Sequence, residues 1–206
     1  MLDKIKEALE KGQVPVVAGL IREAKAAGLG ASEILSGGLL AGMEEVGVRF
    51  GKGELFIPEV MLAARAMQAG MDLLKEDLIG DAAAAGQEKI VLGTVQGDQH
   101  DIGKNLVRIM LTGAGYEVID LGVNVPAEKF VQTAKDAGAR LIGLSALLTT
   151  TMVQMEKVVS LAHAEGIRVM IGGAPVTGAF AEKIGADGYS ASASEAAELA
   201  GRLLQK

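Results

Sequence analysis

Residues 89–122 read KIVLGTVQGDQHDIGKNLVRIMLTGAGYEVIDLG, which is a short β-branched run, a polar loop, a helical pattern and a second short run. Similar runs follow at residues 140–146, 168–174 and 186–190, with helical patterns of ten or more residues between them. This alternation is typical of a parallel sheet with right-handed crossovers and helices on both faces. We therefore predict an α/β domain over residues 88–206, with a flavodoxin-like or Rossmann-like five-stranded parallel sheet.

The predicted fold also indicates where a ligand would bind. In open α/β sheets, ligands lie beyond the carboxyl ends of the strands, at the point where the strand order reverses. If the order is 2-1-3-4-5, this point lies between the loops that follow the first and third strands. We therefore expect a binding site in the residues after Val95 and after Leu144.

Residues 1–80 are predicted to form a four-helix bundle. The last helix has the seam of a packed helix, with apolar residues alternating by four and three positions: Val60, Ala64, Met67, Met71, Leu74 and Leu78. The preceding helix is apolar on one face from Ile34 to Phe50, with Ser32 as its N-cap. Two shorter helices lie near residues 2–11 and 15–27. Residues 81–87 are small and nearly uncharged, which is typical of a linker.

The composition excludes several kinds of site. The 206 residues include no cysteine and two histidines, His100 and His163. Without cysteine there is no disulfide, thiolate zinc site or cysteine nucleophile, and two histidines cannot make a three-imidazole metal site within one chain. Four methionines have helical spacing and are expected in the core rather than at a metal: Met43, Met61, Met67 and Met71.

Charge and hydropathy limit the partners and the location. The chain carries 20 Lys and Arg against 26 Asp and Glu, a net charge of −6, and its basic residues are not clustered, which makes nucleic acid an unfavourable partner. The first residues, MLDKIKEALEKG, have the pattern of an amphipathic helix and not of a signal peptide. No stretch approaches the roughly 20 apolar residues that span a bilayer. We expect a cytoplasmic protein without a membrane partner.

The loop after the first predicted strand contains the pattern Asp98-x-His100-x-x-Gly103. A carboxylate two residues before a histidine can hold one ring nitrogen while the other faces outward, which is how proteins orient imidazole metal ligands. Gly103 at the helix start would let a bulky group approach the backbone. The plain alternative is a surface histidine beside helix-capping aspartates. For His163, inside a predicted helix, we keep the plain interpretation of a partly exposed helix residue.

The segment GDQHDIGKNLV (97–107) closely resembles the cobalamin-binding signature of corrinoid proteins in methyl transfer, shared in outline with methionine synthase and the mutases. Further motifs resemble this family in order: GLSAL at 143–147, IGGA at 171–174, and, in the helical part, VGVRF at 46–50 and GELFIPE at 53–59. The resemblance covers nearly the whole chain. It implies a helical cap followed by a cobalamin-binding domain.

This resemblance implies roles for three residues at the metal. His100 would bind cobalt from below, in place of the cofactor's own dimethylbenzimidazole, and Asp98 would hydrogen-bond His100. Thr151 would complete the relay at a position where methionine synthase has a serine, and its methyl group is a departure from that pattern.

The resemblance also implies a channel for the displaced nucleotide tail of the cofactor. Ser145 and Thr149 would line this channel, and the backbone at Gly172 and Gly173 would lie against the tail. Phe56 of the cap would cover the upper face of the corrin ring. The other residues expected at the cofactor are Gly97, Asp101, Ile102, Gly103, Leu147, Tyr189 and Ser190.

In the systems that this chain resembles, the corrinoid protein is a methyl carrier and not an enzyme by itself. A substrate:corrinoid methyltransferase loads a methyl group from a small donor onto cobalt, and a second methyltransferase passes it to tetrahydrofolate or coenzyme M. We therefore expect these two partners and a reductive activase, with a cap that moves to expose the cobalt. The methyl donor is not indicated by the sequence.

Three alternative functions remain open at this point. A cobalamin sensor would use the same two domains, but it normally needs an output module, and we expect none in this chain. A mutase cobalamin subunit is disfavoured by the methyl-type cap. A phosphate- or nucleotide-binding module, with a hard cation between Asp98 and Asp101, is weakened because the first strand is followed by neither G-x-G-x-x-G nor a P-loop.

Overall fold

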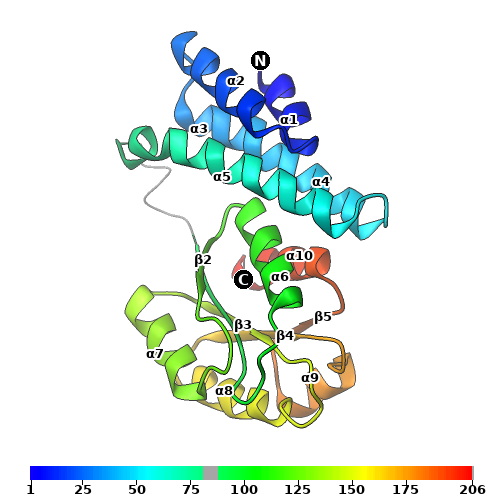
Figure 1. Cartoon of the computed structure of the whole chain (residues 1–206). Coiled ribbons are helices and arrows are strands. Elements are labelled where there is room, and N and C mark those ends of the chain that lie inside the picture. The colour runs from blue at the N-terminus through cyan, green and yellow to red at the C-terminus, as the bar shows by residue number, and fades with distance from the viewer. Residues whose placement is uncertain (81–87, 206) are drawn as a thin grey trace. The chain divides into compact units, whose positions relative to one another are not determined.

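A computed structural model describes residues 1–80 and 88–205. It divides into a helical unit and an α/β unit that begins at Glu88 (Figure 1). The predicted linker, residues 81–87, lies outside the described residues. None of the described helices is both long and apolar enough to cross a membrane.

The helical unit contains the predicted helices at the N-terminal end of the chain. They are α1 (Leu2–Glu10), α2 (Val14–Ala26), a helical run of α3 (Ala31–Ile34), η1 (Leu35–Leu40) and α4 (Ala41–Gly51), and finally α5 (Ile57–Gly80). The core includes Ile5 and Leu9 of α1, Ile21 of α2, and Val60 and Leu74 from the predicted seam of α5, all fully buried. The predicted helical N-terminal part is therefore confirmed.

The third predicted helix differs from an ordinary α-helix because η1 is a π-helix. Ile34, which directly precedes η1, and Leu39 within it are both buried and five positions apart, a spacing that a π-turn brings onto one face. The predicted N-cap Ser32 is wrong, because the helix begins at Ala31 after the extended residue Gly30. Ser32 lies inside the first turn, where its backbone oxygen accepts a hydrogen bond from Ser36.

One of the four methionines expected in the core is exposed. Met43 and Met67 are buried, but Met61 is 44% exposed. Met61 follows the buried Val60 directly, and one residue turns a helix by about 100°, so its side chain leaves the apolar seam.

The α/β unit has the predicted five-stranded parallel sheet, in the order β2-β1-β3-β4-β5. The strands are β1 (Lys89–Thr94), β2 (Glu117–Asp120), β3 (Leu141–Ser145), β4 (Arg168–Gly172) and β5 (Gly188–Ser190). The predicted fold class is confirmed, and β1 and β3 are neighbours at the point where the strand order reverses. The loops after these two strands therefore meet at one edge of the sheet.

Helices cover both faces of this sheet (Figure 1). They are α6 (Ile102–Gly113), α7 (Ala127–Ala137), α8 (Val153–Ala164), α9 (Gly178–Ile184) and α10 (Ala193–Leu204). On one face, α7 and α8 bury Phe130 and Met155 against Val91 and Ile142. On the other face, Leu111 of α6 and the apolar residues of α10 pack on the opposite side chains of the same strands. The two apolar layers hold the strand ends in register.

Four residues near the carboxyl ends of the strands form a row across the sheet. Thr94 of β1 pairs with Ser145 of β3, Ser145 with Gly172 of β4, and Gly172 with Ser190 of β5. This row brings the three motifs of the α/β unit, which are far apart in the sequence, to one edge.

Candidate functional site

The loop between β1 and α6 carries the Asp-x-His pattern. The chain turns at Gly97, whose φ of 85° is a conformation that glycine adopts without steric cost. After this turn the Asp98 side chain points inward and is fully buried, whereas the side chain of His100 is 50% exposed. The loop therefore holds a charged group inside the protein and an imidazole at its surface.

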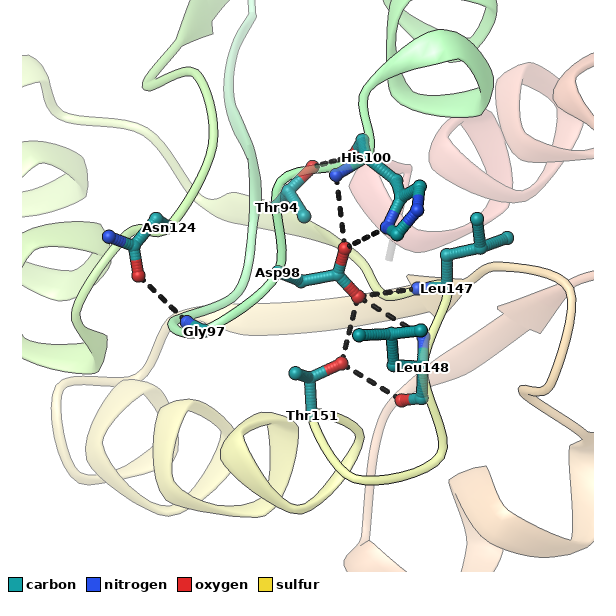
Figure 2. A network of polar contacts seen from close by, with 8 residues as sticks. All are labelled: Thr94, Gly97, Asp98, His100, Asn124, Leu147, Leu148 and Thr151. Carbon is teal, nitrogen blue, oxygen red and sulfur yellow. Dashed lines mark hydrogen bonds and ion pairs between the residues drawn. The ribbon is translucent and has the colours of Figure 1, made fainter.

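The Asp98 carboxylate accepts hydrogen bonds on both of its oxygens (Figure 2). Oδ1 lies 3.0 Å from the backbone nitrogen and 2.7 Å from ring Nδ1 of His100. Oδ2 accepts from the backbone nitrogens of Leu147 and Leu148, at 2.8 and 3.2 Å, and from Thr151 Oγ1, at 2.8 Å. These donors come from the loop after β1 and the loop after β3, so the carboxylate ties the two loops together.

The hydrogen bonds decide the charge of this buried group. Burial raises the pKa of Asp98, but the hydrogen bonds from the backbone of His100 and Leu147, and from the side chains of His100 and Thr151, lower it by more. The net pKa lies well below the ordinary value for an aspartate, so Asp98 is an anion at neutral pH.

The ionised carboxylate also sets the tautomer of His100. Because an ionised carboxylate only accepts hydrogen bonds, we assign the ring proton to Nδ1, which donates to Asp98. Nε2 is then left with its lone pair, on a ring that is half exposed. This is the arrangement that orients a metal-binding imidazole and strengthens it as a ligand.

Thr151 is buried next to the carboxylate and has two acceptors for one proton. Its Oγ1 lies 2.8 Å from Asp98 Oδ2 and 2.8 Å from the backbone oxygen of Leu148. Its methyl group packs over Gly97, at 3.4 Å from the position that a Cβ would take there. The methyl group noted in the sequence therefore has a place in the structure, against the turn that precedes Asp98.

Both oxygens of Asp98 face N–H or O–H donors, which disfavours a hard cation at this position. Asp101 lies in the same loop, but its Oδ2 accepts a hydrogen bond from Asn105. Among the described residues no group of three or more His, Cys, Asp or Glu side chains could hold a metal ion. The alternative with a cation between Asp98 and Asp101 therefore has no support in the geometry.

The other residues expected in the α/β unit lie along the same edge or next to it. Ser145 and Gly172 belong to the row across the strand ends, and Ser190 at the end of this row is buried. Tyr189 precedes it in β5 and is half-buried, while Thr149 is exposed in the loop after β3. Phe56 belongs to the helical unit, where it is 71% exposed.

Gly173 follows the row and has no room for a side chain. Its φ is 130°, and a Cβ there would lie 1.9 Å from the backbone oxygen of Ala146. At Gly172 the corresponding distance to the backbone oxygen of Ser190 is 3.1 Å. The two glycines therefore allow neighbouring backbone segments to approach closely where β4 ends.

Comparison with known families identifies the family of proteins to which this site belongs. Two family models, each described as a B12 binding domain, match residues 88–198 and residues 1–75. The chain belongs to the B12-binding corrinoid proteins. Its cofactor is cobalamin.

Individual relatives agree with this assignment. A dimethylamine corrinoid protein of Methanosarcina barkeri is 46% identical over 99% of this chain and 97% of its own. A corrinoid protein of Desulfitobacterium hafniense strain Y51 is 42% identical over 100% of this chain and 98% of its own. Such corrinoid proteins occur in methyltransferase systems.

Solved structures of similar proteins have the same fold. A cobalamin-binding protein from Desulfitobacterium hafniense DCB-2 has a TM-score of 0.79 and 34% identity, over 98% of both chains. The methanol:cobalamin methyltransferase complex of Methanosarcina barkeri contains a chain with a TM-score of 0.88 and 30% identity, over 98% of this chain and 78% of that one.

The residues of this corrinoid protein fit a cobalamin. An imidazole nitrogen with a free lone pair suits a transition metal such as cobalt, and His100 presents Nε2 in that form. Ile102 is 74% exposed and Leu147 is 43% exposed, so apolar side chains that could face a corrin ring lie in the two loops that Asp98 joins.

Three residues that support the loop were not identified from the sequence. Asn124, at a φ of 54°, accepts a hydrogen bond from Gly97 N on its side-chain oxygen, and its backbone nitrogen donates to the backbone oxygen of Asp98. Lys104 is buried and forms an ion pair of 2.6 Å with Asp120 at the end of β2. Thr94 of β1 donates to the backbone oxygen of His100. Two of these residues have a signal in the sequence. Thr94 is a polar residue inside an apolar strand, and Lys104 is a lysine inside the signature segment.

Proposed function

We propose that this corrinoid protein carries a methyl group between two methyltransferases, and that His100 would hold the cofactor's cobalt. Cobalamin supplies the chemistry, because its cobalt can accept a methyl group and give it up. The observation that carries the proposal is the hydrogen bond between the buried Asp98 anion and Nδ1 of the half-exposed His100 imidazole.

The chain's own residues would control the strength of the metal–imidazole bond. Asp98 makes the imidazole a better electron donor through the hydrogen bond to Nδ1. Leu147 and Thr151 help to keep Asp98 anionic by donating to its second oxygen. The hydrogen bond to Asp98 occupies Nδ1, so Nε2 is the ring nitrogen that would hold the metal.

We also propose that the cofactor's nucleotide tail lies along the strand ends beyond β3 and β4. Ser145 and Thr149 would line its path, and Gly172 and Gly173 would lie against it. Tyr189 and Ser190 of β5 would be its outer neighbours. The sheet register supports this path, since Ser145 and Gly172 are partners at the adjacent carboxyl ends of β3 and β4.

We propose a substrate:corrinoid methyltransferase as the first partner. Relatives named as dimethylamine corrinoid proteins, and a similar chain solved in a methanol:cobalamin methyltransferase complex, support a partner of this class. Methylamines and methanol are accordingly the first donors to test. A tetrahydrofolate or coenzyme M methyltransferase would be the second partner, and a reductive activase the third.

The carrier function is tested by following a labelled methyl group. The holoprotein, reduced and mixed with a purified methylamine or methanol methyltransferase and its labelled donor, should retain label after gel filtration and release it to an acceptor methyltransferase. The cobalamin-free protein is the control and should retain none. Cobalamin-loaded protein that takes up no label from any methyltransferase would favour a sensor or a mutase subunit and would contradict the carrier proposal.

A further inference from the structure

Thr94 is a buried hydroxyl in an otherwise apolar stretch of strand. Its side chain is fully buried, and the flanking Gly93 and Val95 are buried as well. A buried hydroxyl is unfavourable unless it forms a hydrogen bond. The hydroxyl of Thr94 donates to the backbone oxygen of His100, at 2.8 Å.

The sheet holds Thr94 on both sides. Its backbone nitrogen donates to the oxygen of Gly122 at 2.9 Å, and its backbone oxygen accepts from Val125 N at 3.0 Å. On the other side of β1, Thr94 is the register partner of Ser145 in β3. A β-branched side chain has few χ1 conformations, so the position of the hydroxyl is set by the strand.

His100, in contrast to the buried Thr94, lies at the surface. It lies between Gln99 and Asp101 in a loop where all three residues are exposed. The contact with Asp98 fixes the ring and the backbone N–H, but it leaves the peptide group after His100 free to turn. The hydrogen bond from Thr94 reaches this peptide group, so the backbone of His100 is held at its nitrogen and at its oxygen (Figure 2).

We propose that Thr94 is a positioning residue that holds the His100 loop in its metal-binding conformation before cobalamin binds. This inference rests on the proposed role of His100 as the metal ligand. Thr94 acts through the backbone of His100. Because Thr94 is fixed in β1, its hydrogen bond restricts the motion of the exposed loop. A ligand held in this way loses less conformational freedom when the metal binds, so affinity rises without a new contact to the cofactor.

The expected effect is on ligation rather than on the fold as a whole. Thr94→Val keeps the shape of the side chain but leaves the His100 oxygen without its donor. Loss of one buried hydrogen bond should weaken binding of hydroxocobalamin by about five- to tenfold. Thr94→Ser keeps the hydroxyl and should bind within about twofold of wild type, because the hydrogen bond can still form. Thr133→Val on α7, the same change in the same unit, is the matched control.

The experiment measures affinity for hydroxocobalamin and, after reduction to cobalt(II), the fraction of protein with histidine splitting in the EPR spectrum. Thr94→Val should lower both values, and Thr94→Ser and Thr133→Val should leave both close to wild type. Unchanged affinity and splitting in Thr94→Val would overturn the inference. If the wild-type protein itself had no histidine splitting, the proposed role of His100 would fail instead, so the two failures are distinguishable.

A second measurement needs no cofactor. The backbone amide of His100 donates to Asp98, so in the apo protein it should exchange with deuterium faster in Thr94→Val, or in Thr94→Ala if the valine variant does not fold, than in wild type and in Thr94→Ser, because the loop has lost the hydrogen bond from Thr94. Equal exchange rates in the variant and in wild type would show that Thr94 does not hold the loop and would overturn the inference.

Discussion

The ring nitrogen Nδ1 of His100 lies 2.7 Å from Oδ1 of Asp98, and the imidazole is half exposed although the carboxylate is fully buried. The anion is kept inside the protein by donors from two loops, and one of its oxygens faces a ring that a ligand can reach. The buried carboxylate thereby connects the two loops: it bonds the backbone of the loop after β3 and the imidazole in the loop after β1.

Replacing Asp98 with Asn should destabilise the fold. In either orientation of the amide, its NH₂ group faces N–H or O–H donors, so at least one of the donors around Asp98 is left unpaired. We expect the free energy of unfolding in urea to fall by about 1–3 kcal/mol. Asp187→Asn is the control, because Asp187 also bonds a histidine and a backbone N–H but is partly exposed. Equal losses in the two variants would contradict the account.

The same carboxylate should make stability depend on pH in acid. The folded pKa of Asp98 is depressed below the ordinary 3.8, so its contribution is complete above that value and is lost as the pH falls through the folded pKa. The difference in unfolding free energy between wild type and Asp98→Asn should be constant from about pH 7 to about pH 5 and should shrink below about pH 4. Urea titrations over this range measure it, and a difference that grew below pH 4 would have the wrong sign.

Thr151 offers a separate test of the hydroxyl and the methyl group. Thr151→Ser keeps the hydrogen bond to Asp98 and loses only the methyl group over Gly97, so it should cost less than about 1 kcal/mol. Thr151→Val keeps the shape and removes the donor, which should cost about 1–3 kcal/mol. Thermal and urea unfolding of both variants provide the comparison. A less stable serine variant would show that packing, and not the hydroxyl, matters at this position.

Gly103 distinguishes folding from cofactor binding. A Cβ at Gly103 would have no heavy atom within 4 Å, so Gly103→Ala should leave the apo protein as stable as wild type or more stable. If a corrin ring approaches this backbone, the added methyl group should weaken cobalamin binding by about tenfold, a loss typical of a steric clash of order 1.4 kcal/mol. Gly19→Ala in α2, where a Cβ also has open space, is the control and should bind normally. Normal binding by Gly103→Ala would remove Gly103 from the cofactor site.

The architecture of the α/β unit was predictable because each strand is a short apolar run between turn residues and helical patterns. The strand order 2-1-3-4-5 places the loops after β1 and β3 together, and Asp98 and Thr151 of these loops are in direct contact. In the helical unit, the seam of α5 was visible as alternating steps of four and three. The π-helix was not predicted, because the sequence was interpreted as a regular α-helix. The spacing of five positions between the apolar residues Ile34 and Leu39 fits the π-helix.

The supporting residues could not be predicted because their roles arise only when distant segments meet. Thr94 and His100 are six residues apart, but their hydrogen bond requires the turn at Gly97. Asn124 is 27 positions from Gly97, and nothing in the sequence indicates its positive φ. The exposure of Met61 likewise depends on which neighbours pack against α5. Local patterns predict helices, strands and motifs, whereas such tertiary contacts have no local pattern.

The most direct test of the central claim is an EPR spectrum of the protein loaded with hydroxocobalamin and reduced to cobalt(II), prepared with nitrogen-14 and with nitrogen-15 histidine. The chain has only two histidines, and His163 also bonds an aspartate, so His163→Ala is the matched control. We predict a superhyperfine splitting that changes with the histidine isotope in wild type and in His163→Ala and is lost in His100→Ala. A splitting that persists in His100→Ala, or a cobalamin-loaded wild type without any histidine splitting, would contradict the assignment of His100 as the metal ligand.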